Sequence, residues 1–364
     1  MIMSPPNRVT RLDVARKAKV SLATVTYALN PTGKLRISIK TQARIRDIAA
    51  QMGYRPNYVH RALSAGKTYS VGLIVPDSKA LLFPLYEMII DGCVDRMNAD
   101  KYDPLLLLRS RWERVSQVVR DGRVDGLILV QSDGEDRYIR EAAALGVPVV
   151  VLNRDLPADL PEKRSACVYA DHQHMLADVV DEFKALGCRN ILNFSSSAGT
   201  FTNRVYFDAF NEAMAAQSAS GLIGSTIAPI WKDFKLQAEG LFATPLRWDG
   251  IFVDGAPTAD ELIRVAAEAG RVPGRDFHLI AADAYPESES YAVQPARLRR
   301  ERAVYWQPAR EVGHAGWRMM SALIAGESVP VTTRVPYVRE AFDGRRTTDP
   351  LPETTGGIIY AKRV

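Results

Sequence analysis

Three short helical patterns separated by two turns occupy the first 54 residues, and they constrain the fold more than any other feature of the chain. Leu12, Ala15 and Val20 are spaced to form the inner face of a first helix and of the turn that follows it. Ser21 is placed to cap a second helix, because a serine hydroxyl accepts hydrogen bonds from the free amides of a first helical turn. The apolar residues of this second helix recur at helical spacing: Val25, Ala28 and Leu29.

A third helix is predicted to begin near Ser38. Its apolar residues are three, four and seven positions apart, which places them on one face: Ile45, Ile48, Ala49 and Met52. Gly53 is expected to end it, since glycine adopts the left-handed backbone of a helix C-terminus at little cost. Two helices joined by a tight turn and packed on a third predict a helix-turn-helix unit, with a generic three-helix bundle as the alternative.

The charge of the chain is concentrated in this segment. Residues 1–69 contain 13 Lys and Arg against two Asp, a net charge of +11. Residues 70–364 contain 34 basic and 40 acidic residues, a net charge of −6. A small basic unit on a mildly acidic body suits a polyanionic partner such as DNA, because each neutralised phosphate releases counterions. A solvated basic tail is the alternative, although it would not need helical periodicity and caps.

The second helix of a helix-turn-helix lies in the major groove and presents its early residues to base edges. We therefore expect Leu22, Ala23 and Tyr27 to face bases, while Thr24 and Thr26 face phosphates. Apolar side chains at the first two positions favour contact with a thymine methyl. The predicted DNA contacts of this unit are Arg11, Ser21, Leu22, Ala23, Thr24, Thr26, Tyr27 and Asn30.

Residues 9–63 resemble the head of LacI/GalR-family transcription regulators. The shared pattern consists of Val-Thr-x-x-Asp-Val-Ala from Val9, Val-Ser-x-x-Thr-Val from Val20, Asn30, Gly-Tyr-x-Pro-Asn from Gly53, and Arg-x-Leu from Arg61. In that family the segment after Pro-Asn becomes helical only on operator DNA, and its leucine is wedged into the minor groove at the centre of a palindrome. The resemblance implies this role for residues 57–65, with Leu63 as the wedge and Asn57 and Arg61 as DNA contacts. An ordinary apolar linker residue is the alternative for Leu63.

The head departs from the family pattern at Lys19, Tyr27 and His60, and in a slightly longer loop over residues 31–36. The turn between the first two helices holds Lys19 where the family usually has glycine, so a left-handed backbone there would cost about 1–2 kcal/mol. Tyr27 stands where many members have arginine. Together with Leu22 and Ala23, these differences predict an operator that differs from the commonest one of the family.

From Ser70 onward, short apolar runs alternate with helical segments, which predicts parallel sheets with crossover helices. The candidate strands are Val71–Val75, Pro104–Leu108, Gly126–Val130, Pro148–Leu152, Ala166–Tyr169, Asn190–Phe194, Gly250–Val253 and Phe277–Ala281. The candidate helices include Leu85–Asn98, Ile139–Leu145, His174–Leu186, Val205–Ala216 and Ala259–Ala269. Ligands of such folds bind at the carboxyl ends of the strands, often between two lobes.

This part also resembles the family, whose body is like a periplasmic sugar-binding protein. The resemblance implies an all-α helix-turn-helix head joined by a hinge helix to an α/β two-lobe domain with parallel sheets. The expected divisions are a head over residues 1–55, a hinge helix and linker over 56–69, and a two-lobe effector and dimerisation domain over 70–364. The chain would cross between the lobes three times, so that lobe 1 comprises about 70–167 and 301–331, and lobe 2 about 168–300 and 332–364.

Three residues are expected to bind an effector because they match positions of the family pattern: Asp171, Arg204 and Asp283. An arginine and carboxylates together offer bidentate donors and acceptors to vicinal hydroxyl groups. The implied ligand is therefore a sugar or related polyol. For each residue an ordinary loop or helix-cap charge is the alternative.

Other classes of function find little support in the sequence. No apolar run reaches the roughly 18–20 residues of a membrane span, and the N-terminus has no signal-peptide core. Cys93, Cys167 and Cys188 lack metal-ligand spacing and are expected to be reduced, buried thiols. We find no P-loop and no nucleophile elbow.

We therefore expect a cytoplasmic homodimeric repressor, without cofactor, metal or catalytic activity. It would bind double-stranded, pseudo-palindromic operator DNA under the control of a carbohydrate effector. A solute-binding protein with a misread N-terminus and an α/β enzyme acting on sugars or nucleosides are the alternatives.

Overall fold

The computed structural model divides the chain into a head, Met1–Thr68, and a body, Tyr69–Val364. It describes residues 9–29, 37–54, 66–82, 84–130, 136–160, 163–195, 201–227, 233–242, 246–283, 303–340 and 346–347. In this part of the chain no helix is long and apolar enough to cross a membrane.

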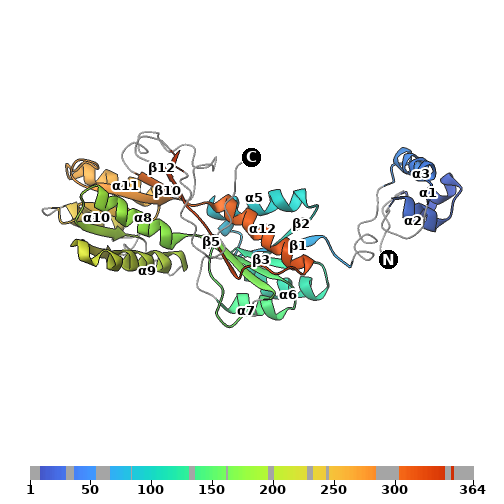
Figure 1. Ribbon diagram of the computed structural model, residues 1–364, viewed down its shortest axis with the longest axis horizontal. Coiled ribbons are helices and arrows are strands. Elements are labelled where there is room, and N and C mark those ends of the chain that lie inside the picture. The colour runs from blue at the N-terminus through green and yellow to red at the C-terminus, as the bar shows by residue number, and fades with distance from the viewer. Residues whose placement is uncertain are drawn as a thin grey trace. The chain divides into compact units, whose positions relative to one another are not determined.

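The described part of the head consists of α1 (Arg11–Ala18), α2 (Leu22–Leu29) and α3 (Ile39–Gln51), as the sequence predicted (Figure 1). Its core is made of small and branched side chains: Val14, Ala15, Ala18, Val25, Ala28, Ile45 and Ala49. Leu12 was expected on the inner face of α1 and is instead 48% exposed. The buried stripe of α1 is centred on Val14 and Ala18, and Leu12 lies about a third of a turn away from it.

The local signals that delimit α3 are those expected from the sequence. The Ser38 hydroxyl accepts a hydrogen bond from the Thr41 amide at 3.2 Å, which satisfies one free donor of the first turn. Gly53 has a φ of 67°, and its amide donates to the Ala50 carbonyl just after the helix ends. A residue with a side chain would be strained at that φ.

The first sheet of the body is parallel throughout and has the strand order β11-β5-β4-β3-β1-β2. Its strands are β1 (Ser70–Val75), β2 (Asp103–Leu108), β3 (Gly126–Val130), β4 (Val149–Leu152), β5 (Ser165–Ala170) and β11 (Thr332–Val335). Helices α5 (Pro84–Ala99) and α12 (Ala309–Ala325) cover one face, and α6 (Trp112–Arg120) and α7 (Asp136–Ala144) cover the other. Two single 3-10 turns, Ala80–Leu82 and Arg109–Arg111, precede α5 and α6.

The second sheet has the order β13-β12-β10-β9-β8-β6-β7, with β12 antiparallel to its neighbours. Its strands are β6 (Asn190–Phe194), β7 (Ile223–Ile227), β8 (Gly250–Val253), β9 (His278–Asp283), β10 (Ala303–Trp306), β12 (Val338–Glu340) and β13 (Arg346–Thr347). Helices α8 (His172–Ala185) and α9 (Phe201–Ala216) cover one face, and α10 (Phe234–Phe242) and α11 (Ala256–Glu268) cover the other. A 3-10 turn, Ser218–Ser220, follows α9.

The chain passes between the two sheets three times, after β5, after β10 and after β11, and these positions differ from the expected limits of the lobes. Residues 168–170 and 332–335 were expected in lobe 2 but belong to the first sheet, where β11 pairs with β5. Residues 303–306 were expected in lobe 1 but form β10, which pairs with β9 of the second sheet. The hydrogen-bonding partner of each short strand, rather than its own apolar pattern, determines its lobe.

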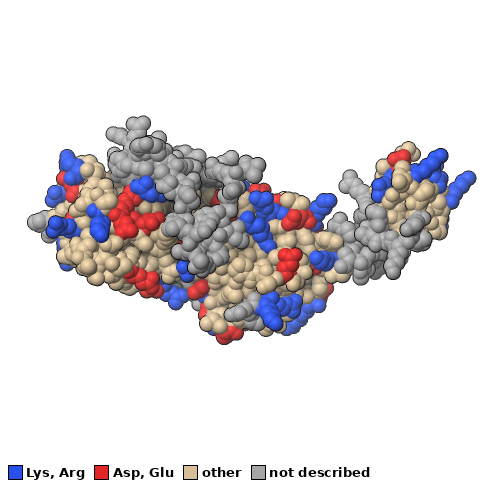
Figure 2. All heavy atoms as spheres, in the orientation of Figure 1, with Lys and Arg blue, Asp and Glu red and all other residues tan. Residues whose placement is uncertain are grey.

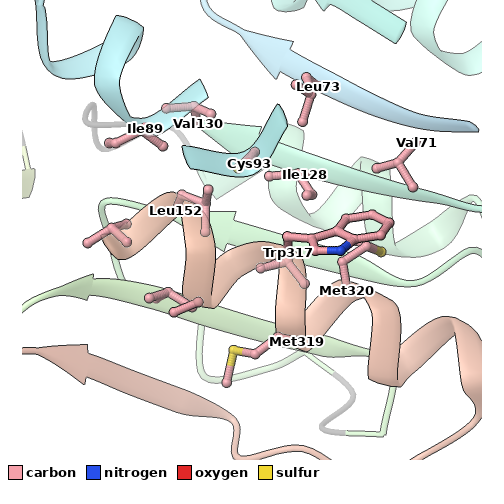
Figure 3. Packing of buried hydrophobic residues seen from close by; sticks show 14 of the residues in the cluster. Val71, Leu73, Ile89, Cys93, Ile128, Val130, Leu152, Trp317, Met319 and Met320 are labelled. Atoms are coloured by element: carbon pink, nitrogen blue, oxygen red, sulfur yellow. The ribbon is translucent and has the colours of Figure 1, made fainter. Parts of the chain in front are cut away.

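Helix α12 supplies much of the core of the first lobe although it comes from the last sixth of the chain. Trp317 and Met320 are buried against the sheet, and Figure 3 shows them beside Val71 and Ile128. The indole nitrogen of Trp317 donates to an Asp100 carboxylate oxygen at 2.6 Å, so its one polar atom is satisfied. The first lobe is therefore complete only when α12 packs on it.

Candidate nucleic-acid interface and ligand site

The start of α2 is held by hydroxyl groups. The Ser21 hydroxyl accepts from the Thr24 amide at 3.1 Å and lies 2.8 Å from the Thr24 hydroxyl. The predicted capping role of Ser21 is therefore confirmed. These contacts fix the first turn of α2. The same two hydroxyl groups are of the kind that also bind DNA phosphates.

The exposed surface of α2 has an apolar start and a polar continuation. Leu22 is 48% exposed and Ala23 is also exposed, whereas Tyr27, one turn later, is half-buried. The Thr26 hydroxyl donates to the Leu22 carbonyl at 2.9 Å. The helix thus offers methyl and methylene groups where a major-groove reader contacts base edges.

Side-chain hydrogen bonds attach α2 to α3, and attach α1 to Tyr54 just after α3. They were not predicted from the sequence. The Ala28 carbonyl near the end of α2 accepts from Arg46 Nε at 3.2 Å and from Gln42 Nε2 at 3.5 Å, both on α3. Their spacing of four residues was a usable signal, since it puts both side chains on one face of α3. Arg11 Nε donates to the Tyr54 hydroxyl at 3.1 Å, so this predicted DNA contact also takes part in packing α1 on the end of α3.

Lys19 occupies the turn between α1 and α2 in the left-handed conformation, with φ 52° and ψ 48°. Its amide donates to the carbonyls of Ala15 and Arg16, which ends α1. Lys19 therefore has the left-handed backbone conformation that favours glycine, the residue of the family pattern at this position. At the other end of α1, Thr10 and Asp13 form a reciprocal cap, and the hydrogen bonds from Thr10 lower the pKa of the Asp13 carboxyl.

The described part of the head is basic. It has eight basic residues, which are Arg11, Arg16, Lys17, Lys19, Lys40, Arg44, Arg46 and Lys67. Its acidic residues are Asp13, inside the cap of α1, and Asp47. Figure 2 shows the Lys and Arg side chains at the edge of the head. Four predicted DNA contacts lie outside the described residues: Asn30, Asn57, Arg61 and Leu63.

In the body, the three predicted effector residues fall at element ends. Asp171 caps α8, since its carboxylate accepts from the His174 amide at 3.3 Å, which is the helix-cap alternative considered above. Arg204 is exposed on the first turn of α9. Asp283 is the last residue of β9, and its side chain lies outside the described set.

A second polar group, which the sequence reading missed, lies at the carboxyl end of β4. Asn153 is buried with φ 67°, and its side-chain oxygen accepts from Gln307 Nε2 at 3.0 Å. Arg154 is 3% exposed and contacts Asp136 at 2.5 Å and Asp155 at 3.5 Å. The signal in the sequence was the run Asn-Arg-Asp directly after the apolar strand Val149–Leu152.

Electrostatics connects this group to α9 of the other lobe. Burial raises the pKa of the Asp155 carboxyl, while the positive charges of Arg154 and, more weakly, Arg204 oppose that rise. Arg204 of the second lobe and Asp155 of the first therefore interact. A carboxylate just after a strand of one lobe and a guanidinium on the first turn of a helix of the other lobe give a hydroxylated ligand both an acceptor and a donor.

The described residues hold no group of three or more His, Cys, Asp or Glu side chains that could bind a metal ion. The three cysteines are free and buried, as expected. Burial raises the pKa of the Cys93 and Cys188 thiols to about 12, so neither is a reactive thiolate at neutral pH.

Residues 10–57 match the family model of bacterial regulatory proteins, lacI family. The chain is 27% identical over 212 residues to the transcriptional regulator MalR of Streptococcus pneumoniae, covering 57% of this chain and 62% of MalR. It thus spans about three fifths of that relative. It is 24% identical to the ribose operon repressor of Halalkalibacterium halodurans, covering 75% of this chain and 80% of that repressor.

Two solved structures share the fold over nearly the whole chain. The lac repressor dimer bound to operator and the anti-inducer ONPF superposes with a TM-score of 0.70 at 20% identity, covering 94% of this chain and 99% of that one. The complex of the regulator CelR with cellobiose superposes with a TM-score of 0.59 at 19% identity, covering 93% and 100%. Residues 10–57 are therefore a LacI-family DNA-binding domain, and the body that follows has the fold seen in the lac repressor.

Proposed function

We propose that the chain is a cytoplasmic, homodimeric transcriptional repressor whose affinity for a pseudo-palindromic operator is controlled by a small hydroxylated effector. The observation that carries this proposal is the exposed, apolar start of α2 on a basic three-helix head. A helix with that surface reads base edges, and the surrounding Lys and Arg side chains neutralise phosphates.

A dimer with two heads is expected because a palindromic operator has two half-sites. Two helix-turn-helix units related by a twofold axis read two half-sites about one helical turn apart, which a single head does not achieve. Residues 57–65 would form the hinge between head and body, with Leu63 inserted at the centre of the site and Asn57 and Arg61 beside it. Such insertion costs a few kcal/mol of base unstacking, which contacts with the bent DNA offset.

The effector is expected at the carboxyl ends of the strands, between the lobes. We expect Arg204, Asp155 and Asp283 to contact it, whereas Asp171 would act there mainly by capping α8. Arg154 is already paired with two carboxylates, so no buried unpaired cation among the described residues favours an acidic ligand. A neutral sugar or polyol suits this balance, and the named relatives include a ribose operon repressor and a cellobiose complex.

The test is a gel-shift series on the full-length protein with DNA sites selected from a random pool. The proposal predicts enrichment of a palindrome and a steep fall in affinity with salt, with a slope of about −0.9 for each phosphate neutralised. Leu63→Ala should reduce palindrome binding strongly, whereas Leu236→Ala, an exposed leucine on α10, should leave it unchanged. A protein that selects no sequence would refute the proposal, and unchanged binding by Leu63→Ala would refute the wedge.

The effector class is tested separately by thermal-shift screening of sugars and polyols, followed by mass spectrometry of each stabilising compound. A regulator returns the compound intact, whereas an enzyme converts it. Arg204→Ala should abolish the thermal shift. Stabilisation only by phosphorylated or acidic compounds would contradict a neutral effector.

A further inference from the structure

A chain of three polar side chains lies where the first and third crossings enter the second lobe. His172, the first residue of α8, is buried with 1% exposure. Its Nδ1 atom lies 2.9 Å from the Tyr337 hydroxyl, which in turn lies 2.9 Å from the Tyr206 hydroxyl. The three residues come from α8, from the link between β11 and β12, and from α9. Segments 34 to 165 residues apart are therefore joined at one point.

The rings of this triad also pack on one another. The His172 ring meets the Tyr206 ring edge-on with centroids 5.1 Å apart, and its centroid is 5.7 Å from that of Tyr337. Tyr206 packs edge-on against Phe252 of β8 at 6.0 Å. Offset and edge-on contacts of this kind add to the hydrogen bonds, so the triad has a defined geometry rather than a loose one.

The orientation of the His172 ring depends on its hydrogen bond with Tyr337. Burial, with a smaller effect of the Arg334 charge, lowers the pKa of His172 to about 3, so the ring is neutral in the cell. A neutral imidazole has one donor and one acceptor nitrogen. Within the described residues its Nε2 atom has no hydrogen-bond partner. The Tyr337 hydroxyl is thus the polar group that fixes the ring.

The backbone continues this connection into the first lobe. The Asp171 amide donates to the Val335 carbonyl at 2.8 Å, and the Cys167 amide donates to the Val331 carbonyl at 2.8 Å. The first and third crossings therefore run side by side up to the triad. On the other side, Tyr206 lies two residues after Arg204 on the first turns of α9.

We propose that His172 and Tyr337 are positioning residues that tie α9, through Tyr206, to the first and third crossings. A displacement of the first turns of α9 then moves both crossings together. This inference rests on the proposed function, because it assumes that an effector contacts the first turn of α9.

The test measures amide hydrogen exchange by mass spectrometry on the full-length protein without ligand. Tyr206→Phe and Tyr337→Phe each remove one hydroxyl and keep the ring. Tyr138→Phe is the matched control, because its hydroxyl accepts from Arg137 on α7, outside both the triad and residues 332–340. Since one buried hydrogen bond contributes about a factor of five to a local opening equilibrium, Tyr206→Phe should speed exchange in residues 332–340 about fivefold.

If the three residues act as one unit, two further results are expected from the same measurement. The double variant should exchange no faster in residues 332–340 than Tyr337→Phe alone, because both variants break one chain of contacts. Exchange in residues 332–340 of Tyr138→Phe, and exchange of the α11 amides in every variant, should be unaffected. Unchanged exchange in residues 332–340 of Tyr206→Phe, or an equal loss of protection in α11, would overturn the inference. Failure of the proposed function would appear instead as a wild-type protein that binds no operator.

Discussion

The Cys93 thiol lies 3.4 Å from the carbonyl oxygen of Gly313, which places the backbones of α5 and α12 in direct contact. A β-carbon on Gly313 would lie 2.9 Å from the Cys93 amide nitrogen and would also meet the Ile89 carbonyl. A β-carbon on Gly92 would meet the Arg310 carbonyl in the same way. Only residues without a side chain allow these helices to approach so closely.

Gly313→Ala is therefore expected to destabilise the body, because the clash is with backbone atoms that move only if the helices separate. Overpacking of this kind costs about 1–3 kcal/mol or more. The control is Gly240→Ala on the exposed side of α10, where an added β-carbon meets nothing within 4 Å. That change should stabilise the protein by about 0.5–1 kcal/mol. Urea unfolding followed by circular dichroism measures both, and equal stabilities would contradict the close contact.

Lys19→Gly should stabilise the head by about 1 kcal/mol, because glycine adopts the left-handed backbone of this turn without strain. Lys17→Gly removes the same charge from the last turn of α1, where the backbone is helical, and should destabilise the helix by up to about 1 kcal/mol. Hydrogen exchange in residues 11–29 of the full-length protein reports both changes. The same sign of effect for the two variants would show that charge, not backbone conformation, controls the turn.

Leu22 and Leu12 form a matched pair on the head, since each is 48% exposed. If α2 reads base edges, Leu22→Ala should change which bases are preferred at one position of each half-site. The loss of one apolar contact to a thymine methyl is expected to cost about 1 kcal/mol, or roughly fivefold in affinity. Leu12→Ala on α1 should leave the preference unchanged. Selection of binding sites from a random pool, followed by sequencing, gives the answer, and a shift caused by Leu12→Ala alone would place the reading surface elsewhere.

The buried His172 predicts acid sensitivity. Its pKa is lowered from 6.5 to about 3 in the folded protein, so below pH 6.5 the unfolded chain binds a proton that the folded chain does not. Stability should therefore fall as the pH decreases from about 6.5 toward 3, by about 2 kcal/mol between pH 6.5 and pH 5. His172→Asn removes this titration.

Urea unfolding of the wild type and of His172→Asn at pH 7 and pH 5 measures the effect. The variant should start less stable at pH 7, because the hydrogen bond between the His172 ring and the Tyr337 hydroxyl is lost, and should then lose about 2 kcal/mol less on acidification. Parallel pH dependences would mean that His172 becomes protonated without unfolding.

Local chemistry made much of the fold predictable. Ser21, Ser38 and Gly53 each act through atoms within a few residues, and the structure has the caps and the stop that the sequence indicated. Strands with continuous apolar runs, such as Gly126–Val130, were predicted for the same reason, because burial on both faces leaves a clear pattern.

The elements that the sequence did not indicate depend on distant partners. β7 reads Ile-Gly-Ser-Thr-Ile and is an edge strand that becomes recognisable only through its pairing with β6. α12 contains Gly313 and Gly316, which lower helix propensity locally and are explained by contacts with α5 and with Leu152. The approximate lobe limits differ from the sheets by a few residues, because β10 and β11 are only four residues long and are assigned to a lobe by the strands they pair with.

In the candidate site, too, residues with a local sequence signal were predicted and residues that depend on distant partners were not. Asp171 and Arg204 stay predictions made from their positions, and Asp171 caps a helix, a role that spacing alone does not separate from a ligand contact. Asn153 and Gln307 form a buried pair from residues 154 positions apart, and neither side chain has a local signature. Polar groups of this kind become visible only when the fold brings the strand ends together.

The late position of α12 and β11 has a consequence for how the protein is made. The head is complete once residue 68 has left the ribosome, whereas the first lobe waits for Trp317, Met320 and the strand Thr332–Val335. For the synthesis of some 260 residues, about 13–50 seconds at ordinary bacterial rates, a nascent chain carries a folded head on an unfinished body. Any product that stops in this interval would have a DNA-reading unit without the part that controls it.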